Sequence, residues 1–277
     1  MEKGNKSLLC LYYSLTFPSL ESSTSTQNPA WCRHKAIVSY FQVLLEAVKS
    51  RDTKRIQQLI RGRLVEPKEI HLGVSKKARE GVGLGRVQEG QIIQAITQSS
   101  ALAGGAIRDI QELELHITGL GPDKVSDLIA NIIKNHLADF TEEVCSHYNV
   151  QTRPCVVSFF WDSDTLQWNS KYGNLPVKGD HSYILVPKDF VRREQDTVNH
   201  QHFYDRYILD FFVHEQQTAL DSLAATLKTS PSRVTKSSLR KDPPIPLQKT
   251  AISSFIQKHP EIIDQYRQKL VLVCGAK

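Results

Sequence analysis

The chain has 277 residues, of which 40% are hydrophobic, and its formal net charge is +6. This length can hold one large domain or two small ones, and no apolar run approaches the ~18 residues that a membrane-spanning helix needs. Its five cysteines are scattered and form no CxxC pair. That usage disfavours a disulfide framework or a zinc finger, and it predicts a reducing, cytoplasmic compartment.

The first 33 residues predict an irregular N-terminal extension. Two lysines precede a short apolar stretch at 8–15, which Tyr and Ser interrupt, and no small-x-small cleavage site follows it. A secretory signal peptide is therefore not expected. The Ser/Thr-rich run at 20–30 indicates a linker. The domain organisation predicted is an extension at 1–33, an α/β core at 34–200 and a helical C-terminal region at 201–277.

The first half of the core predicts helices on either side of a glycine-rich loop. Apolar residues recur at three- and four-residue spacing, which is typical of amphipathic helices. A break is expected near Asp52, and the pair Gly104-Gly105 ends the second helix. The elements predicted here are helices at 34–60 and 87–102, a strand at 69–75 and a flexible loop at 81–85.

The second half predicts strands followed by helices. Leu113, Leu115 and Ile117 alternate with Glu112, Glu114 and His116, which is the pattern of a half-buried strand. The fold class predicted is α+β (or α/β), with a small mixed sheet flanked by helices and a helical C-terminal part. The other elements predicted are a helix from 123, strands at 155–162 and 181–188 joined through Trp168, a helix at 202–227, a proline linker at 240–247 and a final helix at 248–270 broken at Pro260.

The stretch "ITGLGPDKVSDLIANII", at 117–133, offers the first candidate site. Its Gly119-Leu120-Gly121 turn and Val125 resemble the hairpin of helix-hairpin-helix proteins. In that family the glycines let backbone N–H groups approach DNA phosphates. The alternating segment before the turn and the aspartates after it do not fit the resemblance, because a carboxylate repels phosphate.

The aspartates themselves suggest a metal site. Asp123, Asp127 and Asn131 recur every four residues, so one helical face would present three oxygen ligands, and Glu114 lies just upstream. Such a group could hold Mg²⁺ or Mn²⁺ and polarise a phosphodiester. The alternative is a solvated helix start, in which Asp123 interacts with the helix dipole.

A second resemblance is to restriction-endonuclease-like nucleases. The segments "GLGPDKVSD" and "ILVPK" look like those of uncharacterised bacterial proteins associated with restriction and phage defence. The resemblance implies a metal-dependent nuclease in which Asp127 and Lys188 are catalytic and Glu114, Asp123 and Asp127 bind the metal. Val186 occupies the position where this family has an acidic residue before its lysine.

Basic segments give a third candidate, a nucleic-acid surface. Lys76, Lys77, Arg79 and Arg86 surround glycines at 81, 83 and 85, whose spacing matches neither a Walker A motif nor GxGxxG. This segment is either a basic loop that contacts nucleic acid or a plain flexible loop.

Residues 223–239 resemble a helix-turn-helix, with Ser230 as the expected N-cap of the second helix. The resemblance implies that Arg233, Lys236 and Arg240 face DNA. The alternative is a helix end followed by a basic connector. The histidines at 200, 202 and 214 have no zinc-ligand spacing, so they are expected at the surface.

These signals predict a nucleic-acid-acting protein, with a metal-dependent nuclease in bacterial defence as the first hypothesis. The alternative is a non-catalytic nucleic-acid-binding or scaffold subunit of a larger complex with a protein partner. If the protein neither cleaves nor binds nucleic acid, a protein–protein role through the 203–228 helix remains. No membrane partner is expected.

Overall fold

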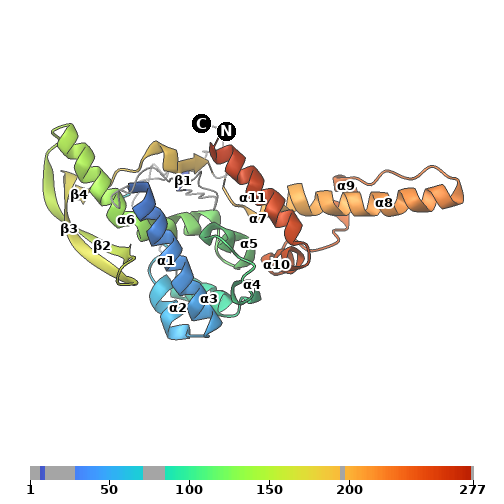
Figure 1. The fold of residues 1–277 in the computed structure, drawn as a ribbon, viewed down its shortest axis with the longest axis horizontal. Coiled ribbons are helices and arrows are strands. Elements are labelled where there is room, and N and C mark those ends of the chain that lie inside the picture. Colours follow the sequence, from blue (N-terminus) through green and yellow to red (C-terminus); the bar gives the residue numbers. More distant parts are fainter. Residues whose placement is uncertain (1–6, 10–28, 71–84, 194–196, 276–277) are drawn as a thin grey trace.

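The computed structural model describes residues 7–9, 29–70, 85–193 and 197–275. It is an α+β protein with a small antiparallel sheet and a helical C-terminal part, which confirms the predicted fold class. Figure 1 shows the sheet at one end, a body of packed helices in the middle and one long helix that projects from the other end.

The N-terminal helices follow the predicted pattern. Asp52 separates the first two, and its carboxylate caps the second by accepting a hydrogen bond from the Arg55 backbone N–H at 2.9 Å. Ser99 divides the helix predicted at 87–102, and Gly104 is the C-cap that ends it. The helices are α1 (Pro29–Lys49), α2 (Thr53–Ile60), α3 (Arg86–Thr97) and α4 (Ser100–Ala103).

Several predicted boundaries in the N-terminal half differ from the structure. Pro29–Arg33, assigned above to the extension, begin α1, and β1 (Ser7–Leu9) pairs antiparallel with β5 (Val191–Arg193). Glu69 and Ile70 lie in a loop rather than a strand, and the rest of the strand predicted at 69–75 lies outside the described residues. The same holds for most of the predicted glycine loop.

The half-buried strand predicted from the alternation at 112–117 is wrong. Residues 110–116 instead form a 3₁₀ turn, η1 (Ile110–Glu112), and a short helix, α5 (Leu113–His116). The alternation misled because Glu112, Glu114 and His116 are buried like the leucines between them. Polar side chains can be buried where they find hydrogen-bond or charge partners, and the C-terminal helices supply these partners.

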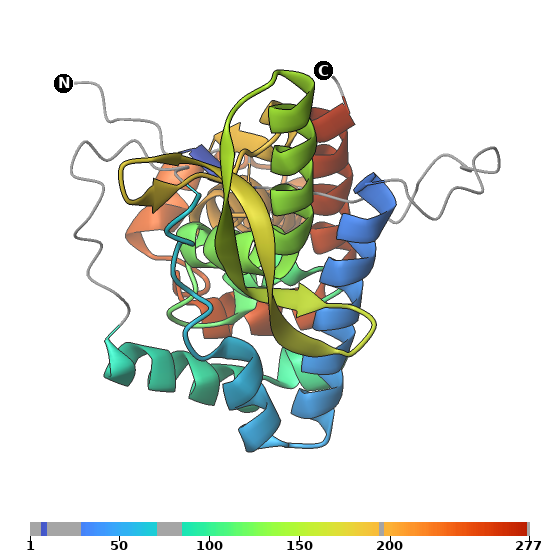
Figure 2. The same cartoon turned by 90° about the vertical axis from the view of Figure 1, so that its left-hand side faces the viewer.

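A glycine corner leads from α5 into α6 (Pro122–His147). Gly119 has φ +88°, and a Cβ there would lie 3.0 Å from the Ile92 side chain, so this position requires glycine. Pro122 occupies the first turn of α6, where a missing N–H costs nothing. The amphipathic helix predicted from Asp123 is thereby confirmed, and it is the central helix of the fold (Figure 2).

The sheet is built on a hairpin of β2 (Thr152–Asp162) and β3 (Gln167–Lys178), to which β4 (His181–Ser182) adds a short edge. The strand at 155–162 is confirmed. The strand predicted at 181–188 extends only to Ser182, and the segment taken as its connection, with Trp168, is β3 itself. β3 escaped detection because one of its faces is largely polar and exposed, so its sequence resembles a loop.

Helix α6 packs on one face of the hairpin, and the hairpin lies on the outside of the molecule (Figure 2). Glu142 of α6 accepts a hydrogen bond from the Asn174 backbone N–H at 2.6 Å. A Cβ at Gly173 would lie 2.9 Å from that carboxylate, so glycine permits this close approach of helix and strand.

The C-terminal helices form a second hydrophobic cluster, which includes Leu115 of α5. The predicted long helix and the break at Pro260 are confirmed, although a π-helical turn at Tyr204–Ile208 interrupts the long helix. None of the described helices combines the length and apolar character needed to cross a bilayer. The helices are α7 (His200–Phe203), α8 (Leu209–Leu227), α9 (Lys236–Lys241), α10 (Lys249–Lys258) and α11 (Pro260–Gly275).

Candidate functional site

Glu114 is the predicted site residue that contacts the C-terminal helices. It lies on α5, its side chain is fully buried, and its Oε1 lies 2.5 Å from Nδ1 of His200 on α7. The same oxygen lies 3.3 Å from Nζ of Lys249 on α10. His200, expected at the surface, is instead partly buried against this carboxylate. Glu114 therefore joins α5 to two separate elements of the C-terminal region.

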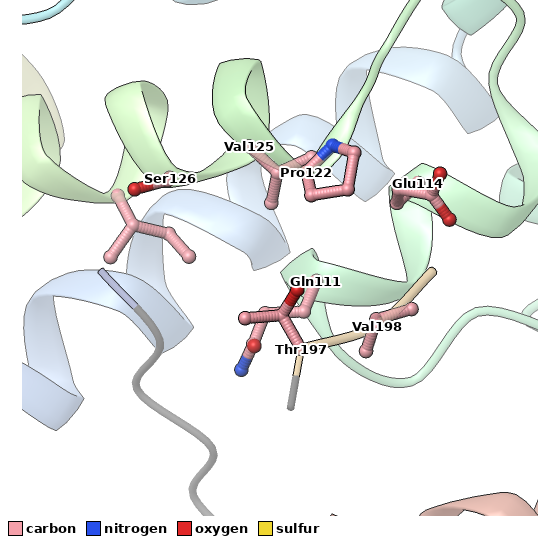
Figure 3. A pocket seen from close by; sticks show the side chains of 8 residues that line it. Gln111, Glu114, Pro122, Val125, Ser126, Thr197 and Val198 are labelled. Atoms are coloured by element: carbon pink, nitrogen blue, oxygen red, sulfur yellow. The ribbon is translucent and has the colours of Figure 1, made fainter. Parts of the chain in front are cut away.

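A small cavity adjoins Glu114 at the start of α6 (Figure 3). It is only large enough for about one water molecule. Oε2 of Glu114 is buried and has no hydrogen-bond partner among the described residues. The cavity suits a buried water on this oxygen but is too small for a substrate. Its lining residues are Gln111, Glu114, Pro122, Val125, Ser126, Ile129, Thr197 and Val198.

Lys249 supplies the cation at this acidic position. Burial lowers the pKa of its ammonium, and the neighbouring Glu114 and Asp123 carboxylates oppose that shift. Its Nζ also donates a hydrogen bond to the Leu120 carbonyl in the corner before α6. A lysine ammonium thus occupies the place where the sequence predicts Mg²⁺ or Mn²⁺ between Glu114 and the aspartates.

The remaining predicted metal residues are spread over different environments. Asp123 is exposed in the first turn of α6, and Asp127 is half-buried one turn later. Asn131 is buried, and its Nδ2 donates to the carbonyls of Arg63 (3.1 Å) and Val65 (2.9 Å), so this side chain fixes the segment after α2. Lys188 is exposed at the start of η2 (Lys188–Phe190).

Within the described residues, no group of three or more His, Cys, Asp or Glu side chains is placed to hold a metal ion. The structure therefore does not assemble Glu114, Asp123 and Asp127 into such a group, and the metal site stays a prediction.

The predicted basic residues divide into three sets. Lys76, Lys77 and Arg79 lie outside the described residues, whereas Arg86 is exposed at the first residue of α3. Arg233 is exposed in the segment between α8 and α9. Lys236 is directed back toward α8, where its Nζ lies 2.7 Å from Asp210 Oδ1 and 3.0 Å from the Asp205 carbonyl oxygen.

The helix-turn-helix resemblance is not supported by this geometry. The second helix, α9, has six residues and begins after Thr235, not after Ser230. Arg240 remains exposed, and its Nη2 lies 3.0 Å from Asp205 Oδ1. A six-residue helix whose Lys236 and Arg240 pair with Asp210 and Asp205 does not present the recognition helix that the resemblance implies.

A different basic residue, Arg63, has an environment that the sequence did not reveal. Its guanidinium carbon lies 4.2 Å from the ring centroid of Phe159 and 4.9 Å from that of Trp168. Asn131 holds its backbone carbonyl, as described above. Its Nε is buried without a hydrogen-bond partner among the described residues. Arg63 is thus a positioned cation on two aromatic rings.

Two further arginines belong to the same stretch of chain, α2 and the residues after it. Arg55 of α2 donates from Nη2 to the Leu166 carbonyl at 2.6 Å, which holds α2 against the turn of the hairpin. Arg61 is exposed two residues before Arg63. We call Arg55, Arg61, Arg63 and Phe159 the basic–aromatic patch. The run Arg61-Gly62-Arg63 and the aromatic residues of β2 were visible in the sequence, but their proximity was not.

One face of β3 runs from the protein interior into solvent. Trp168, Ser170 and Tyr172 share this face because strand side chains alternate, and the register places the extra residue of the bulge on β2. Trp168 is packed between Trp161 and Tyr40, with ring centroids 5.6 and 5.5 Å away. Tyr172, at the other end, is 79% exposed.

The fold and the patch define an α+β protein with two hydrophobic clusters and a positioned arginine at the hairpin. The chain belongs to the family described as Domain of unknown function (DUF8370), whose model matches residues 19–199. The matched region ends at the residue before α7. Comparisons with curated proteins and with solved structures found no match.

Proposed function

We propose that the protein binds nucleic acid through the basic–aromatic patch. The observation that carries the proposal is the Arg63 guanidinium, which rests on Phe159 and Trp168. A guanidinium presents several N–H donors in a planar fork that matches phosphate oxygens, and it also stacks on bases.

The charge of the chain supports this choice of partner. The net charge is +6, and α2 with the residues that follow it contributes Lys54, Arg55, Arg61 and Arg63, of which Arg55 and Arg63 contact the hairpin. Such a cluster attracts a polyanion and predicts affinity that falls as salt rises. The protein would act in the cytoplasm, as its cysteine usage predicts.

Binding without catalysis is favoured over a metal-dependent nuclease. Lys249 already balances Glu114, and a metal ion there would have to displace or repel that ammonium. Nuclease activity in bacterial defence, as the resemblance implies, stays a prediction that the same samples can test. It would use Mg²⁺ or Mn²⁺ and the residues Asp123, Asp127, Glu114 and Lys188.

The binding test uses fluorescence anisotropy with labelled single- and double-stranded oligonucleotides of DNA and RNA over a salt series. We expect wild-type binding to weaken steeply with salt. Arg63→Ala and Arg61→Glu should weaken binding about tenfold or more, whereas Lys258→Glu, an exposed charge on α10, should change it less than about twofold. Wild-type levels of binding by both patch variants would refute the proposal.

The cleavage test follows plasmid and RNA integrity after adding Mg²⁺ or Mn²⁺. Asp127→Ala is the diagnostic variant, because Asp127 is half-buried and its removal spares the buried Glu114 contacts. Metal-dependent cleavage lost in Asp127→Ala would establish the nuclease. Cleavage retained in that variant would exclude the predicted centre, and binding without cleavage would leave the non-catalytic role.

A further inference from the structure

The exposed half of the hairpin face has a composition suited to bases rather than phosphates. Tyr172 is 79% exposed and pairs across the hairpin with Val156, which is 52% exposed. The next pairs on this face in either direction, Pro154 with Asn174 and Ser158 with Ser170, are uncharged. The face is therefore apolar at its centre and uncharged on either side of it, and Arg63 lies toward its Trp168 end.

Phe159 extends this face toward the patch. It lies at the bulge of β2, where its φ of +59° is a costly conformation for a large side chain. Its backbone N–H donates to Oγ of Ser170, and its ring reaches the same guanidinium as Trp168. This backbone leaves the ring 51% exposed. Strain that keeps an apolar ring in solvent points to a contact with a ligand.

The spacing of the Phe159 and Tyr172 rings favours single-stranded over double-stranded nucleic acid. Phe159 lies beside Ser170, and Tyr172 is two residues further along β3, which is about 7 Å of strand. Bases in a duplex are stacked about 3.4 Å apart and offer no free faces in the middle of the helix. Two rings at this spacing can each take a base only where the nucleotides are unpaired and spread apart.

We infer that the exposed half of the hairpin face binds single-stranded nucleic acid, with one unpaired base on Phe159 and another on Tyr172. The phosphates would follow the cations of the basic–aromatic patch, so the inference rests on the proposed function and specifies its ligand. Charge complementarity decides between a strand of nucleic acid and a peptide strand, because the cations at the end of the face suit a polyanion.

The test compares Tyr172→Ala with Tyr172→Phe, which keeps the ring, and with Tyr148→Ala. Tyr148 is the matched control because it is 70% exposed at the end of α6, off this face. Anisotropy is measured with a short single strand, of DNA and of RNA, and with a fully paired duplex. We expect Tyr172→Ala to lose about tenfold affinity for the single strand and little for the duplex. Tyr172→Phe and Tyr148→Ala should stay within about twofold of wild type.

Two results would overturn the inference without touching the proposed function. One is single-strand affinity in Tyr172→Ala equal to wild type while Arg63→Ala is impaired. The other is an equal loss on the single strand and the duplex. If neither the wild type nor any variant binds nucleic acid, both the inference and the proposed function fail.

A second measurement does not depend on a variant. Photo-crosslinking of an oligonucleotide with 5-iodouracil, followed by mass spectrometry, should label the peptides that contain Phe159 and Tyr172. Crosslinks confined to other peptides would overturn the inference.

Discussion

Oε1 of Glu114 lies 2.5 Å from Nδ1 of His200, and this bond joins a helix of the family-matched region to the first residue beyond it. Lys249 binds the same oxygen from α10. The carboxylate therefore forms a junction, a set of contacts that joins the core to the C-terminal helices. Its contribution can be measured as a change in the free energy of unfolding.

Glu114→Ala should be strongly destabilising. The substitution leaves the Lys249 ammonium, whose side chain is only 10% exposed, without its counter-charge. Removing one partner of a buried ion pair typically costs about 3–5 kcal/mol. Urea unfolding followed by circular dichroism measures the change. Glu143→Ala, an exposed residue of α6, should stay within about 0.5 kcal/mol of wild type, and an equally small effect of Glu114→Ala would contradict the junction.

His116 should contribute a loss of stability on acidification. Burial, aided by the charges of Arg267 and Lys249, lowers the pKa of its imidazole from 6.5 to about 4. Between these values the unfolded chain binds the proton and the folded chain does not, so stability is present above the unfolded pKa and is lost as pH falls toward the folded one.

The loss from this one group is roughly 3 kcal/mol at most. The free energy of unfolding, measured from pH 7 downward, should therefore be lowered less by acid in His116→Gln than in the wild type. His181→Gln, at an exposed position of β4, is the control and should keep the wild-type slope.

Two hydrogen bonds to the Leu59 carbonyl, near the end of α2, should contribute non-additively to stability. It accepts hydrogen bonds from the Tyr40 hydroxyl at 3.1 Å and from Nε1 of Trp168 at 3.2 Å. Tyr40→Phe alone leaves the second donor in place, so we expect it to cost only about 0.5–1.5 kcal/mol. Tyr40→Phe combined with Trp168→Phe deprives a buried carbonyl of both side-chain donors. The double variant should then lose about 1 kcal/mol or more of unfolding free energy beyond the sum of the two single losses. Strict additivity in this double-mutant cycle would show that the two hydrogen bonds are independent.

Mg²⁺ and Mn²⁺ should leave the melting temperature of the wild type unchanged. A ligand stabilises a protein only in proportion to its binding to the folded state, and Lys249 already lies beside Glu114 and Asp123. Differential scanning fluorimetry with and without each ion checks this expectation. A clear, saturable rise in wild type that Asp127→Ala abolishes would instead support the predicted metal site.

The sequence was sufficient where one physical signal dominated. The apolar repeat of α6 and the break at Pro260 were predicted correctly because burial of one helical face and the missing N–H of proline act locally. The segment around Glu114 was predicted wrongly because its carboxylate is buried by partners more than 80 residues away, which no local pattern contains. The basic–aromatic patch was missed for the same reason, since Arg63 and Phe159 meet only after the hairpin folds back on α2.

Helix α8 projects from the body, so a small change of its direction moves its far end by a larger distance. Its 19 residues span about 28 Å, and Figure 1 shows the helix projecting away from the body beyond its first turns. At such a length a tilt of about 10° at the base moves the far end by roughly 5 Å. Small repacking beside the π-helical turn is therefore magnified at the tip, where Leu223 and Leu227 are exposed.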